Sequence, residues 1–172
     1  MLKTIRFTLL ALLGVGLVVL LNACVYSFRG GSVPAHLNTI AIPIVEDQSG
    51  FGDPTLRDMV TSELVQRFIN DNSLQMADRG TADSVLEGVI TQVKPDQPVS
   101  VTAGDQVARR RITVTMRVRF QDLKQRKTVW EREFTQYGDY PSGGGLTQRT
   151  EGLREAVRKL TEDILNETVA GW

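Results

Sequence analysis

The amino-acid sequence predicts an α+β fold, a two-layer sandwich in which two helices pack on one face of a four-stranded mixed sheet. Residues 54–69 and 147–164 carry apolar side chains at three- and four-residue spacing, as amphipathic helices do. Residues 108–123 instead alternate between apolar and polar side chains, as a half-buried strand does. The predicted order is strand, helix, three strands, helix, and two helices can cover only one face of such a sheet.

The first strand is expected over residues 37–45 and the second over residues 84–94. Pro43 has no N–H to donate, so the first strand should lie at an edge of the sheet or end there. Gly88 within the second strand indicates a bulge or a close backbone approach. The second strand should then end before a twelve-residue loop, residues 95–106.

The first helix should begin at Asp53 and Pro54, a carboxylate cap followed by a residue that tolerates the first helical position. The polar residues 70–72 should end it. The second helix should begin near Thr147 and end near Gly171. The apolar stripes that should face the sheet comprise Leu56, Met59, Val60, Leu64 and Phe68 in the first helix, and Leu153, Ala156, Val157, Leu160 and Ile164 in the second.

Residues 128–137 provide an antiparallel partner for the strand at 108–123, after a turn at residues 124–126. A three-residue turn pairs Leu123 with Lys127. A shift by one residue would disrupt both faces of this pair of strands. In the predicted register, the facing pairs include Met116–Phe134, Phe120–Trp130, Arg117–Glu133 and Arg119–Glu131.

The N-terminus resembles a lipoprotein signal peptide. Lys3 and Arg6 precede an uncharged run that is shorter than the ~20 residues a bilayer-spanning helix needs. The segment Leu-Asn-Ala-Cys at residues 21–24 resembles a bacterial lipobox, in which the cysteine thiol is acylated and the cysteine becomes the new N-terminus. The alternative is an ordinary signal peptide followed by an incidental buried cysteine.

We therefore expect a signal peptide over residues 1–23, a lipidated tether over residues 24–36 and a folded domain over residues 37–172. Cys24 is the predicted lipidation site, because a lone thiol in an oxidising compartment is a liability unless it is consumed. Several acyl chains such as palmitate make the attachment stable, whereas one alone is marginal. Val25 stands where lipoproteins retained at the inner membrane typically carry aspartate, so the expected location is the periplasmic side of the outer membrane.

The composition excludes several functions. Twenty basic and twenty acidic side chains give a formal charge of zero, which argues against a strongly basic nucleic-acid binder. One cysteine and one histidine exclude a Cys/His metal site and an internal disulfide. His36 should be a solvated linker residue, and no nucleophile with an orienting acid is evident, so we predict no enzyme, no catalytic residue, no metal and no cofactor. The glycines at 143–145 lack the Lys-Ser/Thr of a phosphate-binding loop and predict a hinge.

The most unusual predicted surface is the arginine-rich polar face of the strand at 108–123. Two of its arginines should be neutralised by the glutamates opposite them. Arg109, Arg110 and Arg111 lie at the start of the strand, beside the expected loop. Because guanidinium groups match phosphate bidentately, these three are candidate contacts for an anionic lipid. The alternative is a solvated face with cross-strand ion pairs, each worth about 0.2–1 kcal/mol.

Four segments of the mature chain are similar to a known family: Cys-Val-Tyr-Ser-Phe-Arg-Gly-Gly-Ser-Val-Pro at 24–34, Thr-Ile-Ala-Ile-Pro at 39–43, Ala-Asp-Ser-Val-Leu-Glu-Gly at 82–88, and the closing helix into Gly171-Trp172. Together they resemble the LptE family of lipopolysaccharide-assembly lipoproteins. The resemblance spans nearly the whole mature chain. It implies two helices on a four-stranded sheet, the fold predicted above on separate grounds.

The resemblance also implies a function. Members of the LptE family sit inside the barrel of the large outer-membrane protein LptD, assist its assembly and bind lipopolysaccharide on its way to the cell surface. The implied partners are an LptD-type barrel, lipopolysaccharide and the membrane that holds the lipid anchor. The family's contacts to lipid A phosphates do not match this chain motif by motif. A lipopolysaccharide contact at Arg109, Arg110 and Arg111 is therefore inferred from their charge and placement.

A second group of proteins is also similar: outer-membrane regulatory lipoproteins of the penicillin-binding-protein activator or curli-secretion type. The strand from residue 39 to residue 45 and the capped helix after it resemble the opening of those proteins. They usually carry a longer disordered tether, whereas only about a dozen residues separate Cys24 from the first predicted strand. Such a short tether favours a domain held at the membrane.

Overall fold

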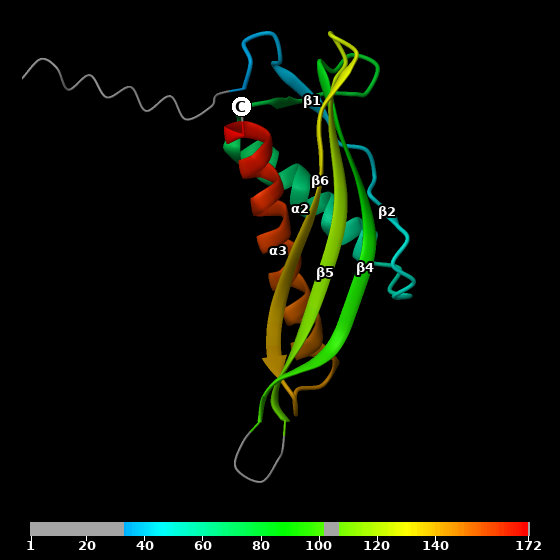
Figure 1. Cartoon of the computed structure of the whole chain (residues 1–172), viewed down its shortest axis with the longest axis vertical. Coiled ribbons are helices and arrows are strands. Elements are labelled where there is room, and N and C mark those ends of the chain that lie inside the picture. Colours follow the sequence, from blue (N-terminus) through cyan, green and yellow to red (C-terminus); the bar gives the residue numbers. More distant parts are fainter. Residues whose placement is uncertain (1–32, 102–106, 172) are drawn as a thin grey trace, which may run out of the picture. The chain divides into compact units, whose positions relative to one another are not determined.

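The computed structural model describes residues 33–101 and 107–171, which belong to one unit built of two layers (Figure 1). Helices α2 and α3 lie on one face of a mixed sheet, so the predicted α+β sandwich is confirmed. The elements in chain order are β1 (Thr39–Ala41), β2 (Glu46–Asp47), α2 (Leu56–Asp71), β3 (Gln75–Met76), β4 (Ser84–Val101), β5 (Val107–Asp122), β6 (Lys127–Pro141) and α3 (Leu146–Ala170).

The sheet contains two short strands beyond the four expected. Its order is β3-β1-β4-β5-β6, with β2 also paired to β4. The strand expected over residues 37–45 is broken: β1 ends at Ala41 and β2 begins at Glu46, and both run parallel to β4. The chain leaves β4 at Pro43, which cannot donate to a ladder, and Ile44 is 65% exposed instead of facing the core. β3 pairs with the outer side of β1, so β1 is not an edge strand.

Strands β4, β5 and β6 form the antiparallel centre of the sheet. The predicted register between β5 and β6 is confirmed from Arg109 to Phe120. The connecting turn has four residues instead of three, so Asp122 pairs with Lys127. An extra residue in β6, Val129, then restores the predicted pairing.

β4 continues to Val101, so the expected loop at 95–106 is wrong over its first half. The ladder to β5 shifts between Lys94 and Gln97, which accommodates Pro95. Within this irregularity Asp96 adopts a left-handed backbone with φ of 57°. The hairpin of β4 and β5 therefore extends beyond the last residue of β6 (Figure 1).

The two helices bury the predicted apolar stripes against the sheet, with Met59 half-buried. α2 begins two residues later than expected, because the Asp53 carboxylate accepts hydrogen bonds from Thr55 N (2.9 Å) and Thr55 Oγ1 (2.7 Å) and holds a turn. Asn72, with φ of 59°, ends the helix as predicted. Across residues 33–101 and 107–171, no helix is both long and apolar enough to cross a bilayer. The sheet contributes Leu86, Ile90, Ile112, Val114, Met116, Val118 and Phe120 to the core.

α3 packs against β6 at a pair of glycines. A Cβ added to Gly138 would overlap the carbonyl oxygen of Gly152 and lie 2.8 Å from its carbonyl carbon. The helix backbone therefore lies directly on the strand backbone here, which only glycine permits. A Cβ at Gly88 would overlap the Met116 side chain, and the ladder to β5 is regular at this position. Gly88 therefore makes room for a side chain, and the predicted bulge or close backbone approach was wrong.

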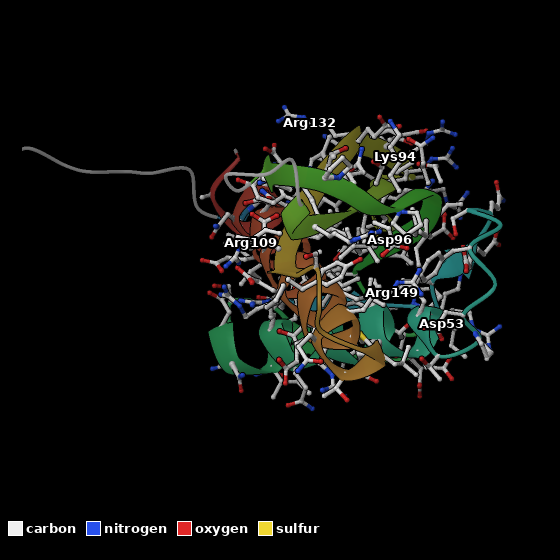
Figure 2. All side chains as sticks on the ribbon, turned by 90° about the horizontal axis from the view of Figure 1, so that it is seen from below. Asp53, Lys94, Asp96, Arg109, Arg132 and Arg149 are labelled. Atoms are coloured by element: carbon white, nitrogen blue, oxygen red, sulfur yellow. The ribbon has the colours of Figure 1, made fainter. Side chains whose placement is uncertain are left out.

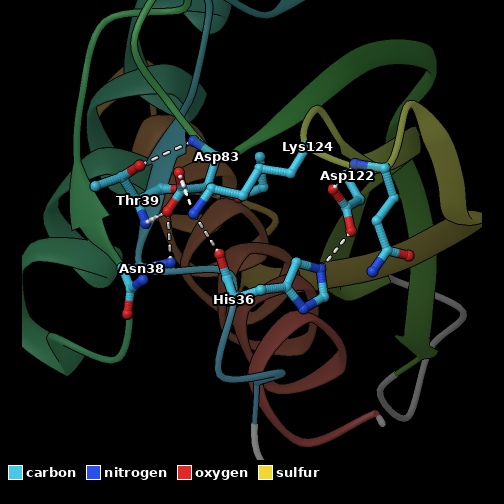
Figure 3. Close-up of polar contacts among 8 residues, drawn as sticks. His36, Asn38, Thr39, Asp83, Asp122 and Lys124 are labelled. Carbon is cyan, nitrogen blue, oxygen red and sulfur yellow. Dashed lines mark hydrogen bonds and ion pairs between the residues drawn. The ribbon is translucent and has the colours of Figure 1, made fainter.

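A polar network fixes the beginning of the described chain to the sheet (Figure 3). His36 Nε2 lies 2.6 Å from Oδ2 of the buried Asp122, so the expectation of a solvated linker residue was wrong. Lys124 Nζ donates to the carbonyl oxygen of His36 (2.7 Å) and lies 2.9 Å from Asp83 Oδ1. Asp83 Oδ2 accepts the backbone amides of residues 38–39 at 2.8 and 3.2 Å.

These contacts stabilise the charged form of both carboxylates. The hydrogen bond from Lys124 and the amide of Asn38 lower the pKa of Asp83 from 3.8 to about 2. Burial alone would raise the pKa of Asp122, but the amide of Gln125 and the contact with His36 hold it below its ordinary value. Both carboxylates are therefore ionised at neutral pH, and the network consists of charge-assisted hydrogen bonds.

Candidate functional site at the hairpin end of the sheet

The three predicted arginines lie together in sequence but not on one surface. They stand at what we call the hairpin end, where β4 leads into β5, β6 ends at Pro141 and α3 begins. Successive residues of a strand point to opposite faces of the sheet. Arg109 and Arg111 therefore lie on the open face, which the helices leave uncovered, and Arg110 lies on the helix-covered face with the buried Ile112.

Arg111 is held in a fixed ion pair on the open face. Its Nε and Nη2 donate to the two carboxylate oxygens of Asp139 at 2.7 and 3.0 Å, and its guanidinium lies 3.5 Å from the centre of the Tyr137 ring. These hydrogen bonds lower the pKa of Asp139 and raise that of Arg111. Arg111 therefore organises this end of the sheet and has little charge left to offer a ligand.

Arg109 is exposed on the open face, at the hairpin end of β5. Its Nη2 makes one long hydrogen bond, 3.5 Å, to the carbonyl oxygen of Asp139. It forms no ion pair with any residue in the described ranges. Of the three predicted arginines, Arg109 is the one whose guanidinium is most available to an incoming anion on this face.

The other arginines of the open face follow the predicted pairing only in part. Arg119 Nε lies 2.8 Å from Glu131 Oε2, a closed cross-strand ion pair. Arg117 stands opposite Glu133 in the register, but it closes no ion pair within the part of the chain that the structure describes. The middle of the open face is thus a mixed-charge surface with no excess of one sign.

On the helix-covered side, the structure adds residues that the sequence did not indicate. Arg149 from the start of α3 places Nη2 3.6 Å from Asp96 Oδ2, and the hydroxyl of the buried Tyr140 donates to Asp96 Oδ1 in a short hydrogen bond. Arg110 stands opposite Tyr140 in the register, next to this group. Figure 2, seen from the hairpin end, shows Asp96 and Arg149 together, with Arg109 apart from them.

Burial and the hydrogen bond to Asp96 raise the pKa of Tyr140, and the positive charges of Arg149 and Arg110 act against that rise. Among the described residues, the four arginines of the hairpin end form ion pairs with two carboxylates, Asp96 and Asp139. The described part of the hairpin end thus carries more guanidinium groups than carboxylates that pair with them.

Three further points concern metal ligands, the glycine run and the predicted lipidation site. Among residues 33–101 and 107–171, no group of three or more acidic, histidine or cysteine side chains could hold a metal ion. The glycine run at 143–145 leads directly into α3. Gly145 is the N-cap residue of this helix, and as a glycine it offers no side-chain acceptor to the first helical amides. Cys24, the predicted lipidation site, lies outside the described residues.

Fold and site together define a small two-layer α+β domain with a basic end, an architecture found in solved bacterial proteins. A protein from Xanthomonas campestris superimposes with a TM-score of 0.61 at 13% identity, over 81% of this chain and 87% of its own. Rare lipoprotein B from Shewanella oneidensis gives a TM-score of 0.50 at 14% identity, over 76% of this chain and 92% of its own. At such low identity, these similarities concern the fold alone.

The family follows from the sequence match. The family model for LptE, described as lipopolysaccharide-assembly, matches residues 37–168, which is most of the chain. The protein therefore belongs to the LptE family, a family of non-enzymatic assembly lipoproteins, and the resemblance noted in the sequence is confirmed. No curated protein matches the chain.

Proposed function

We propose that this protein is an outer-membrane lipoprotein that helps assemble an LptD-type barrel, occupies its interior and aids the transport of lipopolysaccharide to the cell surface. The observation that carries this proposal is the LptE family match over residues 37–168. A lipid anchor at Cys24, on the periplasmic side of the membrane, is part of the same proposal. The role is non-enzymatic: the domain fills space, shapes its partner and contacts the transported lipid.

The size of the domain supports a position inside a large barrel. A chain of ~150 residues has a radius of gyration of ~15 Å, which corresponds to a diameter of ~38 Å. With strands ~4.8 Å apart and tilted by ~40°, a barrel of sixteen strands is ~31 Å across and one of twenty-six strands is ~50 Å across. Only a barrel of the larger class can enclose this domain.

Affinity purification from solubilised outer membrane tests the proposed function. The tagged full-length protein is expected to bring down a very large barrel protein in a one-to-one ratio, because a plug is held by its barrel over a large area. The same tag on a different outer-membrane lipoprotein serves as the control. Recovery of a cell-wall synthase in place of the barrel would reject the proposal and favour the regulatory-lipoprotein alternative.

We also propose that, of the arginines at 109–111, Arg109 contacts a phosphate group of lipopolysaccharide on the open face, because Arg111 is paired with Asp139 and Arg110 lies on the other face. An Arg109→Ala variant is expected to bind lipopolysaccharide about five- to tenfold more weakly at low salt, since it lacks one charge-assisted contact. Arg126→Ala is the matched control, because Arg126 is exposed in the turn at the opposite end of β5. Unchanged affinity of the Arg109 variant in a low-salt binding assay would remove this contact. An Arg111 variant is less informative, because it also breaks the ion pair with Asp139.

A further inference from the structure

We propose that Arg110 and Arg149 form a separate anion site on the helix-covered side of the hairpin end, which takes one phosphate-ester group and in doing so displaces the carboxylate of Asp96. This inference rests on the proposed function for the origin of its ligand, whereas the site itself is argued from the geometry. It is distinct from the open-face contact at Arg109, because the sheet lies between the two faces.

Two nitrogen atoms in this place lack the partners that buried polar atoms normally have. Among the side chains that the structure describes, the buried nitrogen and oxygen atoms without a hydrogen-bond partner are Nε of Arg110 and Nε of Arg149. Nearly all buried polar groups in proteins are hydrogen-bonded, and an exception often marks an acceptor that is not protein. Arg110 stands opposite Tyr140 in the register, and Arg149 lies beside Asp96, which accepts the Tyr140 hydroxyl.

The charges of this group do not balance. Within the described ranges, Asp96 is the one carboxylate in contact with either guanidinium. Its Oδ1 accepts the Tyr140 hydroxyl and its Oδ2 is 3.6 Å from Arg149, which is loose for an ion pair. Arg110 forms no ion pair with the described residues. Among the described residues, one of these two planar, permanently charged donors is thus loosely paired with a carboxylate and the other with none. A phosphate ester has the charge and the oxygen geometry that this pair lacks.

The Asp96 carboxylate occupies the position that the phosphate group would take. Asp96 sits at the irregularity of β4, with a left-handed backbone that non-glycine residues seldom adopt, and this places its carboxylate beside Tyr140 and Arg149. The carboxylate is exposed to solvent, and the Arg149 side chain is 34% exposed, so a ligand can reach the outer atoms of the guanidinium. Leu146, which is 75% exposed one turn before Arg149, and the Phe51 ring, 5.3 Å from the guanidinium, provide apolar contacts for the organic part of an ester.

The test is a calorimetric titration of inorganic phosphate into the full-length protein in neutral detergent. Arg149→Gln and Arg110→Gln are each expected to weaken phosphate binding about tenfold, because each loses a guanidinium fork. Asp96→Asn is expected to tighten binding about fivefold, since it keeps an acceptor for Tyr140 but no longer competes with the ligand by charge. Arg154→Gln, on the exposed side of α3, is the matched control and should bind as the unaltered protein does.

A second arm identifies the source of the phosphate. Vesicles of phosphatidylcholine with phosphatidic acid present a lipid phosphomonoester, and pure phosphatidylcholine vesicles provide the blank. If the Arg149→Gln variant loses binding to the anionic vesicles but not to free phosphate, the ligand is a lipid headgroup. If it loses binding to free phosphate but not to the vesicles, the ligand is a soluble phosphate. Equal binding by the Arg149→Gln variant and the control in both arms would overturn the site. Equal phosphate affinity of the Asp96→Asn variant and the unaltered protein would overturn the displacement.

The test of the anion site and the test of the proposed function can fail independently of each other. Capture of a barrel protein tests the function and does not require phosphate binding. A protein that captures the barrel but binds phosphate equally well with and without Arg149 would reject only the site. A protein that shows the arginine-dependent binding but captures no barrel would reject only the function.

Discussion

Replacing Gly138 by alanine is expected to lower the free energy of unfolding by about 3 kcal/mol, at the upper end of the range for overpacking. The added methyl group would overlap the carbonyl oxygen of Gly152 in α3. Backbone cannot rotate away as the end of a flexible side chain can, so α3 must move off β6. That movement opens the core along the buried Leu153, Val157 and Leu160.

Urea denaturation followed by circular dichroism measures this change. Gly143→Ala is the matched control, because a Cβ there would meet no atom within 4 Å, and its stability should change by less than about 0.5 kcal/mol. A Gly138 variant as stable as the Gly143 variant would show that α3 and β6 do not lie as close together as the structure places them.

Replacing Cys24 by alanine is expected to abolish stable membrane attachment. Each acyl methylene buried in a bilayer contributes about 0.8 kcal/mol, and two or three chains together hold a protein firmly. The variant offers no thiol for acylation, so it should incorporate no labelled fatty acid and should leave the outer-membrane fraction. Residue 24 lies before the described domain, so we expect the loss of membrane attachment to come from the missing anchor and not from unfolding.

Metabolic labelling with a radioactive fatty acid and separation of membrane from soluble protein measure both effects. Val25→Ala is the control, since it keeps the cysteine and changes only the residue after it. The lipid anchor, and with it the proposed location, would be rejected by either of two results. One is that the Cys24 variant stays in the membrane fraction as the native protein does, and the other is that the native protein incorporates no labelled fatty acid.

The parts of the fold that could be predicted are those where one strong pattern dominates. The register of β5 and β6 was predictable because both faces carry information: Met116 and Phe120 need apolar partners, and Arg119 needs an acid. The helix stripes were predictable for the same reason, since their spacing matches the helical period over several turns. The α3 stripe is buried at every predicted position.

The strand boundaries were predicted wrongly where the local sequence pattern and the pairing between strands disagree. The alternation of Ile40, Ile42 and Ile44 suggested one strand, but Pro43 interrupts its pairing to β4, and Ile44 turns outward. Pro95 suggested the end of a strand, whereas a shift in the ladder absorbs it. β3 has only two residues, too few for any periodic signal.

The candidate site was predictable only in its strand component. Arg109, Arg110 and Arg111 are visible as a run, and the period of a strand already separates Arg110 from its neighbours. Arg149 and Asp96 carry no such signal, because they lie 53 residues apart and meet only after α3 has packed on the sheet. Asp96 in particular was assigned to a loop, so its role could not be inferred.

The polar network around His36 has a mechanical consequence. A pull transmitted through the segment before residue 33 is resisted by Val33, which packs against the core, and then by the contacts of His36 with Asp122 and Lys124. Beyond His36, β1 pairs with both β3 and β4, so displacing it would also break the hydrogen bonds of these two ladders. The domain is thus braced where traction on its N-terminal side would enter it.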